Sequence, residues 1–127
     1  MAASLAKGVS VLTNVAKEPE ISDLVDFLNS MGAKISGAGT DKIIVEGVEE
    51  LRGTTYEIPA DRIEAGTYLI AGAVTNGNIT INKIDPERMG AIIENLKKAG
   101  AEVISNGKSI SLNMTNHILK PVNIITA

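Results

Sequence analysis

Residues 61–64, Asp-Arg-Ile-Glu, carry the sequence's most concentrated chemistry. They follow Pro59 and open a nearly uncharged apolar stretch. Asp61 and Glu64 have the types and spacing of a helix cap, in which the first carboxylate accepts first-turn N–H groups and the second reaches back. A cap does not explain Arg62, because a cation near a helix N-terminus opposes the helix dipole. A guanidinium there suits a carboxylate or phosphate. Arg62 is therefore a candidate substrate-binding residue, and Asp61 is a second one that also caps the helix.

A second acidic group lies at another predicted helix start, where Glu18 and Glu20 flank Pro19. Acids at a helix N-terminus are favoured by the helix dipole, and that alone would justify both. Arg88 occupies the position equivalent to Glu20 in the repeat described below, so the repeat does not require an acid there. Glu18 is kept as a candidate substrate-binding residue, and Glu20 ranks below it.

The composition argues against metal sites, cysteine nucleophiles and dinucleotide-binding sites. The chain has no cysteine and a single histidine, His117, which we expect to be a surface side chain. Thiolate metal sites and a cysteine nucleophile are excluded, and we expect neither a metal nor a cofactor. The Gly-x-Gly within residues 36–41 lacks the third glycine and the following helix of a dinucleotide fingerprint, so it predicts a hairpin turn. No catalytic residue stands out.

Charge and hydropathy narrow the class of protein further. The net charge is −3, the twelve Lys and Arg residues are scattered, and aromatic residues make up 2% of the chain. This pattern provides neither the basic stripe nor the stacking surface of a nucleic-acid-binding protein. No apolar run approaches the roughly 20 residues of a membrane span. The first residues are too weakly apolar for a secretory signal, so the cytoplasm is the expected location.

A repeat of about 68 residues positions these groups. Residues 20–32 and 86–100 each show an amphipathic helical stripe that ends at a glycine. Each helix leads into a strand beginning Gly-Ala, a glycine-containing turn and a second strand, at 42–48 and 108–114. Residues 1–12 and 70–81 match as a small-residue helix, a glycine and a strand. The predicted unit is helix–strand–helix–strand–strand and occurs almost twice.

The small-residue helix predicted at 63–75 carries no charge after Glu64. A helix that is apolar all round is expected to be buried, with its Gly and Ala residues allowing close backbone approach. Residues 1–6 resemble the end of such a helix, and residues 120–127 resemble a strand beginning a third unit. We therefore expect an internal piece of a longer protein, with an exposed apolar face that favours self-association.

Two stretches carry a family resemblance: residues 14–51, from Asn-Val-Ala-Lys-Glu-Pro-Glu-Ile onward, and residues 59–74, with Asp-Arg-Ile-Glu-Ala-Gly-Thr. They resemble the enolpyruvyltransferase family, in particular its bacterial UDP-N-acetylglucosamine 1-carboxyvinyltransferases. The resemblance implies an α/β fold built from βαβαββ units in inside-out α/β barrels, of which this chain holds about two units. It also implies that residues 1–58 end one barrel domain, that residues 59–127 begin another, and that the crossover lies near 54–61.

The resemblance further implies an activity. The family transfers the enolpyruvyl group of phosphoenolpyruvate to the 3′-hydroxyl of UDP-N-acetylglucosamine, in peptidoglycan precursor synthesis. Glu18, Asp61 and Arg62 would then border the substrate cleft between the two domains. The family's other catalytic groups fall outside this stretch, so the isolated chain is expected to be inactive. The alternative is a non-enzymatic scaffold or binding module that uses the same repeat fold.

Overall fold

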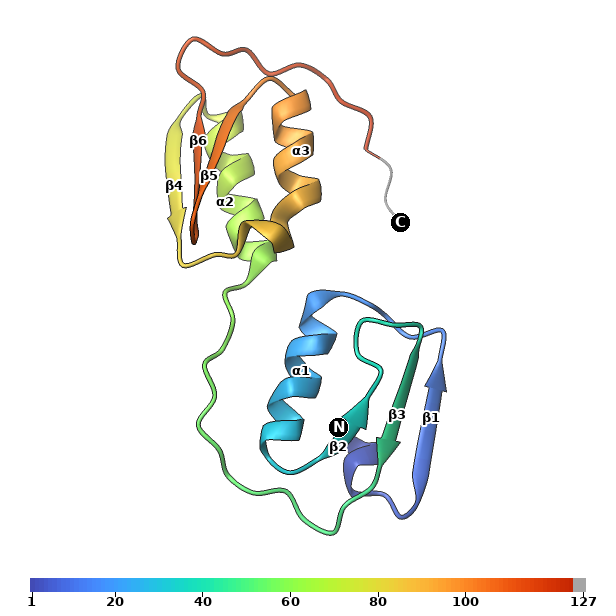
Figure 1. Cartoon of the computed structure of the whole chain (residues 1–127). Coiled ribbons are helices and arrows are strands. Elements are labelled where there is room, and N and C mark those ends of the chain that lie inside the picture. Colours follow the sequence, from blue (N-terminus) through green and yellow to red (C-terminus); the bar gives the residue numbers. More distant parts are fainter. Residues whose placement is uncertain (125–127) are drawn as a thin grey trace. The chain divides into compact units, whose positions relative to one another are not determined.

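The computed structural model describes residues 1–124, which form two compact units (Figure 1). The division falls between Ile58 and Pro59. Each unit has its own three-stranded antiparallel sheet and its own helices. The protein is therefore a mixed α/β chain, as the sequence predicts.

The first unit packs one α-helix against its sheet (Figure 1). Its strands lie in the order β1-β3-β2, so the last strand is central and pairs with both others. In chain order the elements are a 3-10 helix η1 (Ala2–Leu5), β1 (Val9–Thr13), α1 (Pro19–Ser30), β2 (Lys34–Ser36) and β3 (Lys42–Glu46).

The second unit repeats this plan with two α-helices beside its sheet (Figure 1). The strand order β4-β6-β5 again places the last strand in the centre. Its elements are α2 (Arg62–Val74), β4 (Asn78–Asn82), a 3-10 helix η2 (Pro86–Met89), α3 (Gly90–Lys98), β5 (Glu102–Asn106) and β6 (Ser109–Asn113). The matching element and strand orders confirm the predicted repeat.

The striped helices end in the same way in both units. Gly32 (φ +99°) and Gly100 (φ +98°) adopt the left-handed conformation directly after the helix C-caps. In each unit the glycine N–H and the next N–H donate to carbonyls of the helix's last turn, which is the Schellman arrangement. Both glycine stops were predicted from sequence. α2 ends in the same motif, but Asn76 (φ 53°) holds the left-handed position there and Gly77 follows it.

The prediction that the helix at 63–75 is buried all round is wrong for this chain. One side of α2 packs on the sheet and on α3, with Ala65, Leu69 and Ala73 buried. The opposite stripe is apolar but open, because Ile63 is 57% exposed and Val74 is 63% exposed. α2 therefore has two apolar sides, and the described residues cover one of them.

The small residues of α2 do permit close packing, as predicted. A Cβ added at Gly66 would lie 2.6 Å from Cδ1 of Ile92 on α3. A Cβ added at Gly72 would lie 2.7 Å from Cγ2 of Ile79 on β4. The helix therefore approaches its neighbours at two glycines where no side chain fits without movement.

The two units differ in the size of their cores. Among the described residues, the buried apolar set has five members in the first unit and thirteen in the second. The difference reflects the helices, since the first unit has η1, a four-residue 3-10 turn, where the second has the thirteen residues of α2. The predicted helix end at residues 1–6 is this short turn.

The strand predicted at 120–127 is not present in residues 120–124, which have no regular structure, and residues 125–127 lie outside the described part. The segment instead returns to the end of α3, where Lys120 N–H donates to the Ala99 carbonyl at 2.8 Å. Pro121 then removes the next backbone donor, which disfavours a central strand. The apolar residues within 120–127 suggested a strand. Nothing in the sequence indicated the hydrogen bond between Lys120 and Ala99.

Candidate functional site

The entrance of α2 is built around Asp61, which occupies the N-cap position. Its Oδ1 accepts the N–H groups of Ile63 at 2.7 Å and Glu64 at 3.2 Å. This half of the predicted cap is confirmed. The other half is wrong, because within the described residues the Glu64 carboxylate makes no hydrogen bond back to the Asp61 N–H. Glu64 still contributes a favourable charge to the first helical turn.

A shallow hollow of about 230 Å³ opens beside this helix entrance. Four of the residues that line it have polar side chains: Asp61, Glu64, Tyr68 and Asn82. The other four lining residues are apolar: Ala60, Ala65, Ile81 and Ile84. Carboxylates and amides accept hydrogen bonds from hydroxyl groups, whereas two carboxylates repel a phosphate. The hollow therefore suits a neutral, hydroxyl-bearing group such as a sugar.

Arg62 is the first residue of α2 and is partly buried. It is adjacent to Asp61 in the chain but does not line the hollow. The structure therefore separates the roles of two neighbours: Asp61 caps the helix and borders the hollow, and Arg62 lies outside it.

Glu18 lies in the first unit, at the N-cap of α1. Its side chain is exposed and makes no capping hydrogen bond. Pro19 follows at the first helical position, where its missing N–H costs nothing. Glu18 therefore lies where the helix dipole favours an acid, as the sequence suggests, but it makes no capping hydrogen bond and its carboxylate is open to solvent.

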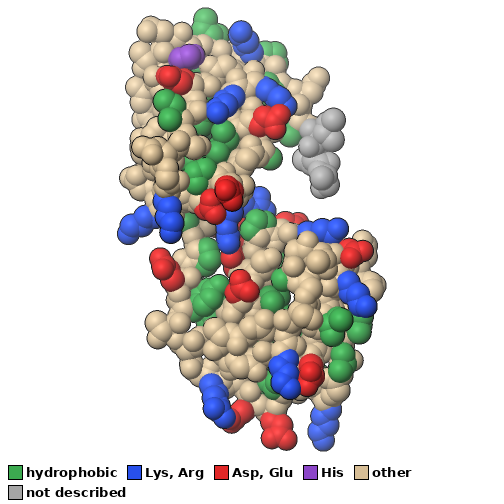
Figure 2. All heavy atoms as spheres, viewed as in Figure 1, with side chains coloured by type: hydrophobic (Ala, Val, Ile, Leu, Met, Phe, Trp, Pro, Cys, Tyr) green, Lys and Arg blue, Asp and Glu red, His purple; other side chains and the backbone are tan. Residues whose placement is uncertain are grey.

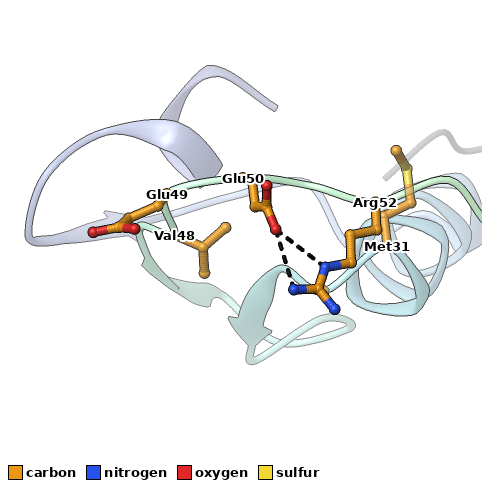
Figure 3. A pocket seen from close by; sticks show the side chains of 6 residues that line it. Met31, Val48, Glu49, Glu50 and Arg52 are labelled. Carbon is orange, nitrogen blue, oxygen red and sulfur yellow. Dashed lines mark hydrogen bonds and ion pairs between the residues drawn. The ribbon is translucent and has the colours of Figure 1, made fainter.

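A second hollow lies at the end of α1, lined by Met31, Gly32, Val48, Glu49, Glu50 and Arg52 (Figure 3). Arg52 donates from Nε and Nη2 to one carboxylate oxygen of Glu50, at 3.2 and 3.1 Å. Both side chains are more than two-thirds exposed, so this ion pair contributes little energy. The sequence did not indicate this hollow, in which Arg52 and Glu50 pair with each other.

Charges elsewhere on the chain are mixed. Figure 2 shows basic and acidic side chains interspersed on the visible face. His117 is a surface side chain, as predicted, and its Nε2 lies 4.0 Å from the Glu102 carboxylate. On α3, the hydrogen bond from Lys98 and then its charge hold the pKa of Glu94 below the ordinary value. Within residues 1–124 no cluster of three potential metal ligands occurs, and no helix there is long and apolar enough to cross a membrane.

Sequence reasoning missed two members of the hollow at α2. Tyr68 lies on α2 and Asn82 ends β4, so the fold brings them together from separate elements. Tyr68 alone carried a signal, because it is a polar-tipped aromatic one turn after Glu64 on the same helix. Asn82 carried none without the strand order.

Comparison with solved structures places this repeat in a known class of fold. The enolpyruvyl transferase NikO from Streptomyces tendae superposes with a TM-score of 0.72 over 87% of this chain and 27% of its own length, at 22% identity. The fold is therefore that of the enolpyruvyl transferases.

The sequence comparisons identify the family. A family model described as EPSP synthase (3-phosphoshikimate 1-carboxyvinyltransferase) matches residues 1–127. UDP-N-acetylglucosamine 1-carboxyvinyltransferase of Hydrogenovibrio crunogenus is 52% identical over 126 residues, and that of Coxiella burnetii is 50% identical over 127. These alignments cover 99% and 100% of this chain but only 30% and 29% of the relatives. The chain belongs to the EPSP synthase family and spans about a third of the length of these relatives.

Proposed function

We propose that this chain works as part of a UDP-N-acetylglucosamine 1-carboxyvinyltransferase, which transfers the enolpyruvyl group of phosphoenolpyruvate to the 3′-hydroxyl of the sugar nucleotide. The observation that carries the proposal is identity of about one half along the whole chain to relatives bearing that name. The reaction belongs to peptidoglycan precursor synthesis and takes place in the cytoplasm. Because the chain spans about 30% of its relatives, the activity is that of a longer protein.

Within that protein, the hollow beside α2 contributes to sugar binding. Its carboxylates, amide and phenol match the hydroxyl and acetamido groups of UDP-N-acetylglucosamine. Both capping bonds of Asp61 go to Oδ1, so Oδ2 is available to a ligand. Asp61 therefore serves as cap and as substrate-binding residue at once.

Arg62 and Glu18 complete the proposed substrate-binding set. The Arg62 guanidinium suits a carboxylate or phosphate, groups that phosphoenolpyruvate and the sugar nucleotide both carry. The uncommitted carboxylate of Glu18 suits a hydroxyl or amide donor. In the barrel arrangement, Met1–Ile58 ends one domain and Pro59–Ala127 begins the next. The segment 54–61 is then the crossover, and these three residues border the cleft.

The chain by itself is expected to lack turnover and to self-associate. It has no cysteine to serve as a nucleophile or acid, and its twelve Lys and Arg residues are scattered along the sequence. The open stripe on α2, with Ile63, Ile70 and Val74 at i, i+7 and i+11, presents an apolar surface that a second copy of this chain can cover. Light scattering should therefore show dimers or larger species whose population grows with concentration. A stable monomer at high concentration would contradict this expectation.

The proposal is tested in the longer protein that contains these residues. Phosphate release from phosphoenolpyruvate should depend on UDP-N-acetylglucosamine. Arg62→Ala is expected to lower kcat/KM by about a hundredfold, the loss of one charge-assisted contact of 1.5–3 kcal/mol. Arg62→Lys, which keeps the charge but not the bidentate geometry, should recover part of it. A protein that folds but releases no phosphate with this pair of substrates would contradict the proposed activity.

Asp61 permits a sharper separation of its two roles. Asp61→Asn keeps a capping oxygen, so the stability should hold while the KM for the sugar nucleotide rises. Asp61→Ser, another good cap without a charge, is the matched control for the cap. If both variants keep the wild-type KM, Asp61 is a cap alone. For the 127-residue chain, titration with UDP-N-acetylglucosamine should shift the Asp61 and Arg62 amide resonances.

A further inference from the structure

Two asparagine–glycine pairs occur in the second unit, at 76–77 and 106–107. An asparagine before glycine is chemically labile, because the following backbone nitrogen can attack the side-chain amide carbon and glycine has no Cβ to hinder the approach. The two pairs consist of the same two residue types. They differ in the hydrogen bonds that their backbones make.

The pair at 106–107 forms the tip of the β5–β6 hairpin. Asn106 pairs with Ser109 as the last rung of the ladder, and Gly107 begins the two-residue turn with φ +55°. Both residues are exposed, and an added Cβ at Gly107 would meet no atom within 4 Å. Within the described residues, the Gly107 N–H makes no hydrogen bond. The attacking nitrogen therefore belongs to an exposed residue and, among the described residues, has no hydrogen bond that must break before it reacts.

The pair at 76–77 forms the C-terminal cap of α2. Asn76 N–H donates to the Ala73 carbonyl at 3.2 Å, and Gly77 N–H donates to the Gly72 carbonyl at 2.8 Å. The Gly77 carbonyl accepts from Met114 N–H at 3.2 Å, which ties the pair to the end of β6 as well. The attacking nitrogen is therefore a hydrogen-bond donor inside a Schellman motif, and it must leave that motif before it can react.

We propose that Asn106 is a site of spontaneous deamidation and that the α2 cap protects Asn76 from the same reaction. The Gly107 nitrogen forms a bond to Cγ of Asn106 and gives up its proton, and the side-chain nitrogen leaves as ammonia. Water then opens the resulting succinimide at either carbonyl, which yields aspartate or isoaspartate. The net change is the exchange of an amide nitrogen for a water oxygen, with one new carboxylate at physiological pH.

Both products alter the hairpin. The aspartate adds a negative charge two residues from Lys108 and leaves the backbone unchanged. The isoaspartate places an additional methylene in the main chain next to the Asn106–Ser109 rung, where the Ser109 hydroxyl now donates to the Asn106 carbonyl at 2.8 Å. Since register in a short hairpin depends on the turn, the isoaspartate form is expected to loosen the end of the β5–β6 ladder.

The experiment ages the 127-residue chain at mildly alkaline pH and follows it by tryptic mass spectrometry. Cleavage after Lys98 and Lys108 isolates residues 99–108, in which Asn106 is the sole asparagine. Cleavage after Arg62 and Lys83 isolates residues 63–83, which contain Asn76. In the native chain, conversion at Asn106 should be about tenfold or more faster than at Asn76, because the hydrogen bonds of the cap must open first. Equal native rates would overturn the proposal.

Two controls separate structure from sequence. In denaturant the two rates should approach each other, because the cap no longer exists; a tenfold difference that persists there would also overturn the proposal. Asn106→Gln lengthens the side chain and disfavours the five-membered ring, so the aged variant should gain far less acidic product. If that variant gains acidic product at the native rate, the reactive site lies elsewhere. Neither result depends on the proposed enzymatic activity.

Discussion

The backbone N–H of Arg52 donates to the carbonyl of Met31, the C-cap residue of α1, at 2.8 Å. The same bond joins Lys120 to Ala99, the C-cap of α3, at the same distance. Both pairs are separated by 21 residues, and each member lies 68 residues from its counterpart. The repeat therefore extends beyond the last strand of each unit, into the segment that leaves it. Residues 52–56 and 120–124 occupy equivalent positions in the repeat.

Removing the Arg52 donor should loosen this exit segment. Arg52→Pro deletes the N–H and leaves the Met31 carbonyl without its partner, at a cost of about 1 kcal/mol or more in the free energy of unfolding. Arg52→Ala keeps the backbone bond and removes only the exposed contact with Glu50, so it should cost a few tenths of a kcal/mol. Urea unfolding of both variants makes the comparison. Equal losses would show that the side chain, not the backbone bond, holds the segment.

The Schellman glycines should tolerate alanine poorly. Gly32→Ala and Gly100→Ala force a Cβ into the left-handed region, at about 1–2 kcal/mol each. Gly100→Ala should be worse, because its Cβ would lie 2.7 Å from the Ile118 carbonyl oxygen, whereas Gly32 has open space. Gly53→Ala is the matched control, since it has neither a left-handed φ nor a close atom. It should be neutral or slightly stabilising. The midpoints of urea unfolding, compared at a constant m-value, rank the stabilities of the three variants. An equal loss of stability for Gly53→Ala would contradict the explanation by the left-handed conformation.

These glycines also show what sequence can and cannot predict. Gly32, Gly100 and the Asp61 cap were predictable because helix ends are local and depend on a few adjacent residues. The open side of α2 was not, since burial depends on which other elements are present and not on the helix's own composition. Residues 120–124 were misassigned because an apolar exit segment and a strand look alike until the Lys120–Ala99 bond is known. Tyr68 and Asn82 come together in the lining of the hollow only through the tertiary structure, so their proximity could not be predicted either.

The two tight glycines of α2 should respond differently to alanine. At Gly66 the obstacle is Cδ1 of Ile92, the flexible end of a side chain. The gain in helix propensity of about 1 kcal/mol should nearly offset the repacking there. At Gly72 the obstacle is Cγ2 of Ile79, which is fixed to a β-branched carbon on a strand, so Gly72→Ala should destabilise by about 1–3 kcal/mol. Thermal unfolding measures both. Gly66→Ala as destabilising as Gly72→Ala would show that α3 cannot adjust.

The Glu94–Lys98 pair makes a prediction about pH. Lys98 Nζ lies 2.6 Å from a Glu94 carboxylate oxygen, and the pKa of Glu94 is held below its ordinary value. A lowered folded-state pKa means that the pair's contribution is present above the unfolded pKa and is lost as pH falls through the folded one. Lys98→Met should return the Glu94 pKa to its ordinary range, as measured by NMR titration. Lys97 is the neighbouring lysine and lacks this contact, so Lys97→Met should leave the Glu94 pKa low. An equal rise of the Glu94 pKa in both variants would mean that the loss of any nearby positive charge has the same effect.

The second unit should be the more stable of the two. Its central strand β6 carries Ile110 and Leu112, which are 0% and 1% exposed. This strand pairs with β4 and β5 on its two edges, and α2 packs against it. The equivalent strand β3 carries Ile43 and Val45, at 7% and 5%, and has the short η1 turn where α2 would lie. Since stability follows buried apolar area, β6 amides should exchange hydrogen more slowly than β3 amides. Leu112→Ala should lower protection across the second unit and leave β3 exchange unchanged. Matching exchange rates for β3 and β6, with both strands affected by Leu112→Ala, would mean that the two units unfold as one.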